Sequence, residues 1–258
     1  MTTVDAGALD VARLRALYLD TVERILCNAI YRDPSVDVTG REHPYDADAR
    51  ANGRDWPTRA LTMIGAKRLH HLRVCAETVL ADRVPGDVIE AGVWRGGASI
   101  MLRAVLAAYG VRDRRVWLAD SFRGLPPPNP ARYPHDAGLC LNDIPVLAVS
   151  RDTVARNFEA LGLLDERVRF VEGLFGDTLG TIDANAFAIV RLDGDLYEST
   201  MQSLEHLYPK LSAGGFLIVD DYGVFDACRA AVHDYRDRHA IGEPIEAIDW
   251  TGAFWRKT

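Results

Sequence analysis

Short apolar segments alternate with helical segments between residues 87 and 239 of the 258-residue chain, and this alternation restricts the possible folds most strongly. Each apolar run, such as "DVIEA", "VWLAD" or "FAIVRLD", is too short for a helix and rich in Val, Ile or Phe. Strands that alternate with helices predict a parallel α/β sheet with right-handed connections. The last segments, "IEAIDW" and "GAFWRK", predict a closing hairpin.

The first 84 residues have a different pattern and are expected to form a helical extension to an α/β domain of residues 85–258. Apolar residues at helical spacing predict helices near residues 14–26 and 62–81. The polar segment between them, residues 31–57, is rich in Asp, Arg, Pro and Gly and predicts a long loop.

The composition excludes several classes of protein. A net charge of −7 argues against a nucleic-acid partner, because phosphate contacts need a basic face. No run of about 20 apolar residues predicts a membrane span, and the start "MTTVDAGALD" lacks the features of a secretory signal. The four cysteines are far apart, which is typical of reduced residues that mostly fill the core, so we expect a cytoplasmic protein. They are Cys27, Cys75, Cys140 and Cys228.

Acidic residues stand repeatedly at the ends of the predicted strands. They are Glu90, Asp120, Glu172, Asp193 and Asp220. Ligands of parallel α/β sheets bind beyond the carboxyl ends of the strands. Five such endings therefore predict one edge of the sheet that carries the functional site.

A glycine-rich turn follows the first strand of this domain in "DVIEAGVWRGGASI". Gly92, Gly96 and Gly97 allow a ligand to approach the backbone, and the helix start beyond them favours a negative group. The spacing differs from the patterns of NAD-binding and ATP-binding loops. Asp120, after the second strand, could accept both ribose hydroxyls, so the pair predicts a cofactor that contains adenosine. In the alternative interpretation the glycines serve packing and Asp120 caps a turn.

Two further strands end in paired aspartates, in "RLDGD" and "VDDYG". Asp193, Asp220 and Asp221 would lie close together on adjacent strands, where carboxylates need a cation. A set of oxygen ligands without His or Cys favours Mg²⁺. We expect Asp195 to have a structural role, because Glu198 follows it at the spacing of a helix capping box. Asp220 could alternatively be a turn residue.

Several segments together resemble the macrocin O-methyltransferase family over roughly residues 14–255. They are "TRALTMIGAKRLHHLR", "VIEAGVWRGGASI", "LADSFRGLP", "LAVSRDTVARNFEALGLLDERVRFVEGLFGDTL", "RLDGDLYEST" and "GGFLIVDDYG". Members of the family methylate sugar hydroxyls of antibiotics such as tylosin, mycinamicin and novobiocin. The resemblance implies a class I methyltransferase fold, with a mostly parallel seven-stranded sheet and helices on both faces. It also implies S-adenosylmethionine, Mg²⁺ and a homodimer or higher homo-oligomer.

The resemblance also implies roles for particular residues. The cofactor-binding residues would be Thr62, Met63, Glu90, Ala91, Gly92, Val93, Asp120, Ser121 and Gly173. The metal ligands would be Asp193, Asp220 and Asp221, and Asp193 would also be the catalytic base. The segment of about residues 125–147 would form a mobile lid.

The mechanism that we expect starts with a glycoside that presents neighbouring hydroxyls to Mg²⁺, which lowers the pKa of a bound hydroxyl. Asp193 then removes its proton, and the alkoxide attacks the sulfonium methyl group. His135 is an alternative base. Two other functions remain open: a catechol-type O-methyltransferase that acts on an aromatic diol, and a cofactor-binding module without enzyme activity.

Overall fold

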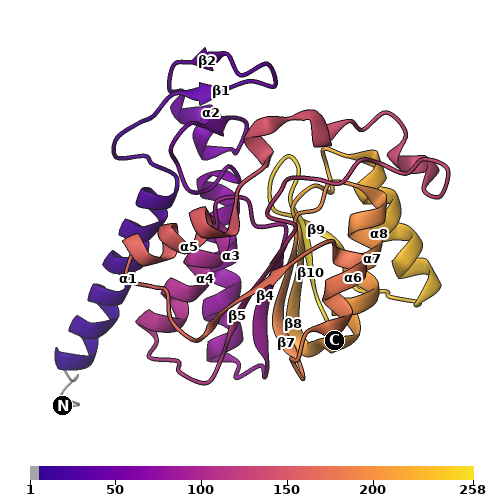
Figure 1. The fold of residues 1–258 in the computed structure, drawn as a ribbon. Coiled ribbons are helices and arrows are strands. Elements are labelled where there is room, and N and C mark those ends of the chain that lie inside the picture. The colour runs from indigo at the N-terminus through magenta and orange to yellow at the C-terminus, as the bar shows by residue number, and fades with distance from the viewer. Residues whose placement is uncertain (1–5) are drawn as a thin grey trace.

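A seven-stranded sheet runs through the centre of the molecule, with helices on both of its faces (Figure 1). The computed structural model describes residues 6–258. The strand order is β6-β5-β4-β7-β8-β10-β9, in which β10 pairs antiparallel with β8 and β9 and the other pairs are parallel. The strands are β4 (Asp87–Ala91), β5 (Val116–Asp120), β6 (Val168–Glu172), β7 (Phe187–Leu192), β8 (Leu211–Val219), β9 (Glu246–Ala247) and β10 (Ala253–Arg256). The predicted sheet and its closing hairpin are therefore confirmed.

Two hydrophobic cores lie on the two faces of the sheet. Residues of α1, α3, α4 and α5 form one core with the sheet, and residues of α7 and α8 form the other. The helices are α1 (Ala6–Leu26), α3 (Gly65–Ala81), α4 (Gly97–Ala108), α5 (Arg151–Ala160), α6 (Phe175–Thr178), α7 (Tyr197–Leu207) and α8 (Asp226–Arg238). Strand β7 is buried along its whole length because both faces are covered.

The N-terminal helices belong to the same core as the sheet. Leu19 and Leu26 of α1 and Leu69 of α3 pack in one cluster with Val88 of β4. The division at residues 84 and 85 stays a prediction, and residues 1–5 of the predicted extension lie outside the described residues.

The polar segment of residues 31–57 is more ordered than the sequence predicts. It contains a small antiparallel sheet of β1 (Ser35–Val36), β2 (Glu42–His43) and β3 (Trp56–Pro57), together with α2 (Ala47–Ala51). Arg50 is buried and donates to Asp33 at 2.8 Å and to the carbonyl of Cys27 at 3.0 Å. A buried ion pair thus organises a segment that composition alone assigns to a loop.

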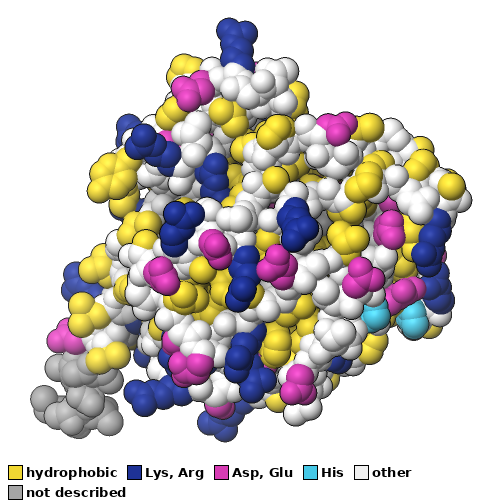
Figure 2. Space-filling view, in the orientation of Figure 1, with side chains coloured by type: hydrophobic (Ala, Val, Ile, Leu, Met, Phe, Trp, Pro, Cys, Tyr) yellow, Lys and Arg dark blue, Asp and Glu magenta, His cyan; other side chains and the backbone are white. Residues whose placement is uncertain are grey.

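Other features of the described chain agree with the sequence. Among residues 6–258 no helix has the length and apolarity needed to cross a bilayer. Cys27, Cys75 and Cys228 are buried as free thiols, whereas Cys140 is exposed. Basic and acidic side chains are interspersed over the face drawn in Figure 2.

Candidate active site

A cavity of about 970 Å³ opens at the carboxyl ends of the central strands. Its walls come from the turns after β4, β5, β6, β7 and β8, from residues 53–68, and from the segment between β5 and α5. This volume is at the upper end of the range for small-molecule sites. The predicted functional edge of the sheet therefore coincides with a cavity.

The turn after β4 packs directly against the turn after β7. Gly92 has a φ of 91°, and a Cβ atom there would lie 1.7 Å from the carbonyl oxygen of Asp193. The Asp193 N–H donates to the carbonyl of Ala91 at 2.8 Å. Packing within the chain alone thus requires glycine at position 92, and the same turn lines the cavity.

Asp120 faces the glycine turn from the end of β5. Its carboxylate accepts the N–H of Val93 at 2.6 Å and the N–H of Phe122 at 2.7 Å. Burial raises the pKa of Asp120, and these backbone donors oppose the shift. Asp120 and Val93 both line the cavity, so the carboxylate lies where a nucleoside ribose is predicted to bind.

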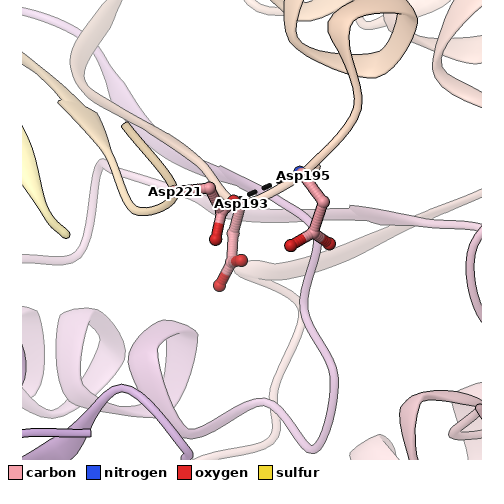
Figure 3. A group of neighbouring side chains, drawn as sticks. All are labelled: Asp193, Asp195 and Asp221. Carbon is pink, nitrogen blue, oxygen red and sulfur yellow. Dashed lines mark hydrogen bonds between the residues drawn. The ribbon is translucent and has the colours of Figure 1, made fainter. Parts of the chain in front are cut away.

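Three carboxylates gather at the ends of β7 and β8. Oxygens of Asp193, Asp195 and Asp221 lie within 4.8 Å of one another (Figure 3). The N–H of Asp195 donates to Asp221 at 3.2 Å. Asp195 has a left-handed backbone with a φ of 58°, which is unfavourable for a non-glycine residue. We name these three residues the carboxylate cluster.

The electrostatics of the carboxylate cluster favour a bound cation. Burial raises the pKa of Asp195 to about 8, and repulsion from Asp193 adds to the shift. Burial and the charge of Asp195 also raise the pKa of Asp221. Three oxygen donors that repel one another suit a hard divalent cation such as Mg²⁺.

Asp220 has different partners from the carboxylate cluster. Arg191 donates to one carboxylate oxygen of Asp220, and Arg68 of α3 donates to the other. Asp220 is buried and also lines the cavity. The structure therefore brings Asp193 and Asp221 together as predicted, but places Asp195 beside them and holds Asp220 in two ion pairs.

Arg191 is a buried arginine within β7 that the sequence analysis overlooked. Only 1% of its side chain is exposed. It donates to Glu90 at 2.6 Å and to Asp193 at 2.9 Å. Burial raises the pKa of Glu90 to about 7 even though Arg191 opposes the shift. One guanidinium thus links the end of β4 to the end of β7.

The predicted capping role of Asp195 is wrong. Helix α7 begins at Tyr197, and Asp195 makes no capping hydrogen bond to it. Asp136 takes this role from a distance of 61 residues along the chain. Its carboxylate, which is fully buried, accepts the N–H of Tyr197 at 2.6 Å and the N–H of Glu198 at 3.1 Å.

The predicted lid forms one wall of the cavity. Residues 121–150 run over the site between β5 and α5 and contain the 3-10 turns η1 (Pro134–Asp136), η2 (Leu141–Asp143) and η3 (Pro145–Leu147) (Figure 1). Tyr133 lines the cavity. His135, the alternative base, is not among the lining residues, and its ring stacks on Tyr197 at 5.1 Å. This placement disfavours His135 as the base, while the mobility of the lid stays a prediction.

Comparison with known proteins identifies the family. The family model described as macrocin-O-methyltransferase (TylF) matches residues 15–257. The chain belongs to the macrocin O-methyltransferase family. It is an O-methyltransferase with the fold of the enzymes that take their methyl group from S-adenosylmethionine.

Three relatives are similar to this protein over nearly the whole chain. An 8-demethyl-8-(2,3-dimethoxy-alpha-L-rhamnosyl)-tetracenomycin-C 4'-O-methyltransferase from Streptomyces olivaceus is 54% identical over 95% of this chain and 94% of its own length. Mycinamicin III 3''-O-methyltransferase from Micromonospora griseorubida is 50% identical over 94% of this chain and 96% of its own length. Demethyldecarbamoylnovobiocin O-methyltransferase from Streptomyces niveus is 47% identical over 94% of both chains.

Solved structures support the fold assignment. The O-methyltransferase NovP has a TM-score of 0.91 and 46% identity, over 95% of this chain and 99% of NovP. The calicheamicin methyltransferase CalS11 has a TM-score of 0.59 at 18% identity, which supports the fold alone. The predicted class I methyltransferase architecture is therefore confirmed.

Most of the predicted site residues of this O-methyltransferase line one cavity. Those that do so are Thr62, Met63, Glu90, Gly92, Val93, Asp120, Ser121, Gly173, Asp193, Asp220 and Asp221. Ala91 is buried within β4 and contributes no wall. The individual roles of these residues stay predictions. Arg68, Arg191 and Asp136 were not predicted as site residues, because most of their partners lie far away in the sequence.

Proposed function

We propose that this enzyme methylates a sugar hydroxyl of a glycosylated natural product, with S-adenosylmethionine as donor and Mg²⁺ at the carboxylate cluster. The observation that carries the proposal is the cluster of Asp193, Asp195 and Asp221 beside the glycine-rich turn after β4. The three relatives, whose names specify glycosylated or related antibiotic precursors, support the class of acceptor.

The turns after β4, β5 and β6 would hold S-adenosylmethionine, which supplies a methyl group on a positively charged sulfur. Asp120 has lone pairs left for ribose hydroxyls after it accepts two backbone N–H groups. Glu90 lies on β4, the strand of this wall that pairs with β7, and is buried against Arg191. The methionine part would therefore lie toward the carboxylate cluster, with the adenine near Gly173.

Asp193 and Asp221 occur both in the predicted metal set and in the observed cluster, so we take them as the central ligands. Mg²⁺ at this position would lower the pKa of a sugar hydroxyl. The two sets differ in one residue, Asp195 or Asp220. A carboxylate oxygen of Asp195 lies within 4.8 Å of oxygens of both Asp193 and Asp221, whereas both carboxylate oxygens of Asp220 accept hydrogen bonds from arginines.

Asp193 is the proposed base. Its side chain is 26% exposed and lines the cavity, while Arg191 holds one carboxylate oxygen at 2.9 Å. The free oxygen would accept the proton of the acceptor hydroxyl. The electron pair of the sugar oxygen then forms the bond to the methyl carbon, and the pair of the broken C–S bond returns to sulfur. Alignment of both substrates by the cavity walls would supply much of the rate.

The acceptor would enter past the lid and the loop of residues 53–56, because both line the cavity. We also propose a homo-oligomer, as the family resemblance implies. Leu14 and Leu17 on the outer side of α1 are 63% and 62% exposed, which supports a subunit contact there. Light scattering of the purified protein tests this, and a monomer at micromolar concentration would contradict it.

The proposed function is tested in two ways: calorimetric titration measures the affinity for S-adenosylmethionine, and a turnover assay measures methyl transfer to a panel of acceptors. The acceptor panel contains the rhamnosyl tetracenomycin, mycinamicin III and demethyldecarbamoylnovobiocin, with a catechol as the alternative. We expect turnover of a glycoside that EDTA abolishes, and a decrease of roughly 10²- to 10⁴-fold in kcat for Asp193→Asn with cofactor affinity unchanged.

Two further variants identify the third metal ligand. Asp195→Asn and Asp220→Asn are compared by titration with Mn²⁺ in the absence of acceptor. The residue that binds the ion is the one whose substitution weakens Mn²⁺ binding more. Turnover that persists in EDTA would refute the metal assignment. Turnover of the catechol but of no glycoside would refute the proposal that the acceptor is a glycoside.

A further inference from the structure

The loop of residues 249–252, between β9 and β10, is fixed to the metal end of the cavity. The N–H of Gly223 donates to the carbonyl of Thr251 at 2.7 Å, and the Thr251 hydroxyl donates to the carbonyl of Asp220 at 3.0 Å. Arg68 donates to Asp249 at 3.1 Å. The loop therefore has a defined position relative to the proposed reaction centre.

Trp250 at the tip of this loop presents an apolar ring to the cavity. Trp250 is 40% exposed although it lines the cavity. Its Nε1–H donates to the carbonyl of Asn52 at 2.8 Å, so the single polar atom of the ring has a partner. The guanidinium of Arg54 lies 5.1 Å from the ring centroid. The ring is thus held on one edge and from one side while part of its surface stays open.

A second exposed apolar residue lies on the same side of the site. Val224 is 42% exposed and lines the cavity, three residues after Asp221 of the carboxylate cluster. Isolated apolar residues on a surface need no explanation, but two that line the mouth of a cavity are typical of a ligand contact. We name Trp250 and Val224 the apolar rim.

The order of the strands separates the apolar rim from the cofactor. The predicted adenine and ribose contacts lie after β5 and β6, whereas the carboxylate cluster follows β7 and β8. Trp250 precedes β10, the next strand beyond β8. The cofactor therefore lies on one side of the carboxylate cluster and the apolar rim on the other, where the remainder of an acceptor would extend.

We propose that the apolar rim binds the aglycone of the glycoside, an uncharged ring system, by contact with the open part of the Trp250 ring. This inference rests on the proposed function, because it requires a sugar at the carboxylate cluster. An apolar ring system gains from burial against an indole, whose flat surface is already held in place. A sugar nucleotide is the alternative occupant, because the guanidinium of Arg54 beside the ring could pair with its diphosphate.

The test compares one sugar with and without its aglycone. Steady-state kinetics are measured with the best of the three glycosides in the panel, with the methyl glycoside of the same sugar, and with its nucleoside diphosphate ester. Trp250→Ala should raise KM for the glycoside about tenfold and leave kcat nearly unchanged, because the lost contact is the same in the ground state and the transition state. KM for the methyl glycoside should not change.

Two variants serve as controls. Trp250→Phe keeps an aromatic surface and should restore most of the affinity if the ring itself is the contact. Tyr31→Ala removes an exposed aromatic residue that does not line the cavity, and it should leave both KM values unchanged. Thermal melting confirms that each variant is folded.

The possible results separate the two proposals. Equal increases in KM for the glycoside and the methyl glycoside would overturn the inference alone, as would an unchanged KM for both. An increase in KM confined to the nucleoside diphosphate sugar would show that the apolar rim binds a nucleotide and not an aglycone. Failure of the wild-type enzyme to methylate any glycoside, with turnover of the catechol, would overturn the proposed function and the inference with it.

Discussion

Replacement of Asp136 by alanine should destabilise the enzyme more than the loss of an ordinary helix cap. Asp136 is fully buried and accepts the N–H groups of both Tyr197 and Glu198. Removal of an N-cap costs about 0.5–2 kcal/mol. Here two partly buried donors lose a carboxylate at once, and the favourable interaction with the helix dipole disappears. We expect a loss of about 2–3 kcal/mol in the free energy of unfolding.

The assay is urea denaturation combined with calorimetric melting. For a chain of this size the loss corresponds to a decrease in Tm of roughly 4–12 °C. Asp136→Asn keeps one acceptor oxygen and should lose about half as much. Ser150→Ala is the matched control, because Ser150 caps α5 at the far end of the same segment through a hydrogen bond to the N–H of Thr153. The Ser150→Ala variant should lose about 1 kcal/mol or less of the free energy of unfolding.

The same variants connect stability with function. Asp195 of the carboxylate cluster is two residues before Tyr197, so loss of the cap should also weaken Mn²⁺ binding, whereas Ser150→Ala should not. The reasoning would be refuted if Asp136→Ala melted within about 1 °C of the wild type, or if the Asn variant were as unstable as the Ala variant.

Three other predictions follow from contacts in the same structure. Arg191→Met removes the cation between buried carboxylates and should lower the free energy of unfolding by about 3–5 kcal/mol, whereas Arg191→Lys should lower it less; urea denaturation measures both. Gly92→Ala should lower both Tm and kcat, because the new Cβ would lie 1.7 Å from the Asp193 carbonyl oxygen. Burial lowers the pKa of His71 to about 4, so unfolded chains take up this proton at higher pH than folded chains. The contribution of His71 to the free energy of unfolding is therefore present above pH 6.5 and is lost as the pH falls from about 6.5 to 4, by up to about 1.4 kcal/mol per pH unit. Denaturation curves of a His71→Phe variant should lack this part of the pH dependence.

The sequence was sufficient to predict the sheet and the position of the site. Strand and helix patterns depend on neighbouring residues, and the carboxyl ends of parallel strands necessarily meet at one edge. Asp120, Asp193 and Asp221 were found for this reason. The position of an acid at a strand end does not depend on details of side-chain packing.

The partners of the buried charges could not be predicted in the same way. The spacing of Asp195 and Glu198 fits a capping box, yet Asp136, 61 residues before Tyr197, occupies the end of the helix. Likewise Asp33 and Arg50 look like residues of a polar loop, but they form a buried ion pair. Such pairs depend on three-dimensional proximity, and neither periodicity nor composition contains it.

The close contact between Gly92 and Asp193 has a consequence for altering the acceptor range of the enzyme. The glycine-rich turn after β4 and the turn that carries the proposed base share a backbone contact that leaves no room for a single added carbon atom, so neither turn can be redesigned without the other. The lid and the loop of residues 249–252 lie outside that contact. Libraries that diversify these two segments but keep Asp136, Asp249 and Thr251, which bond to α7, Arg68 and the Asp220 backbone, can therefore vary acceptor choice while the methyl-transfer machinery stays intact.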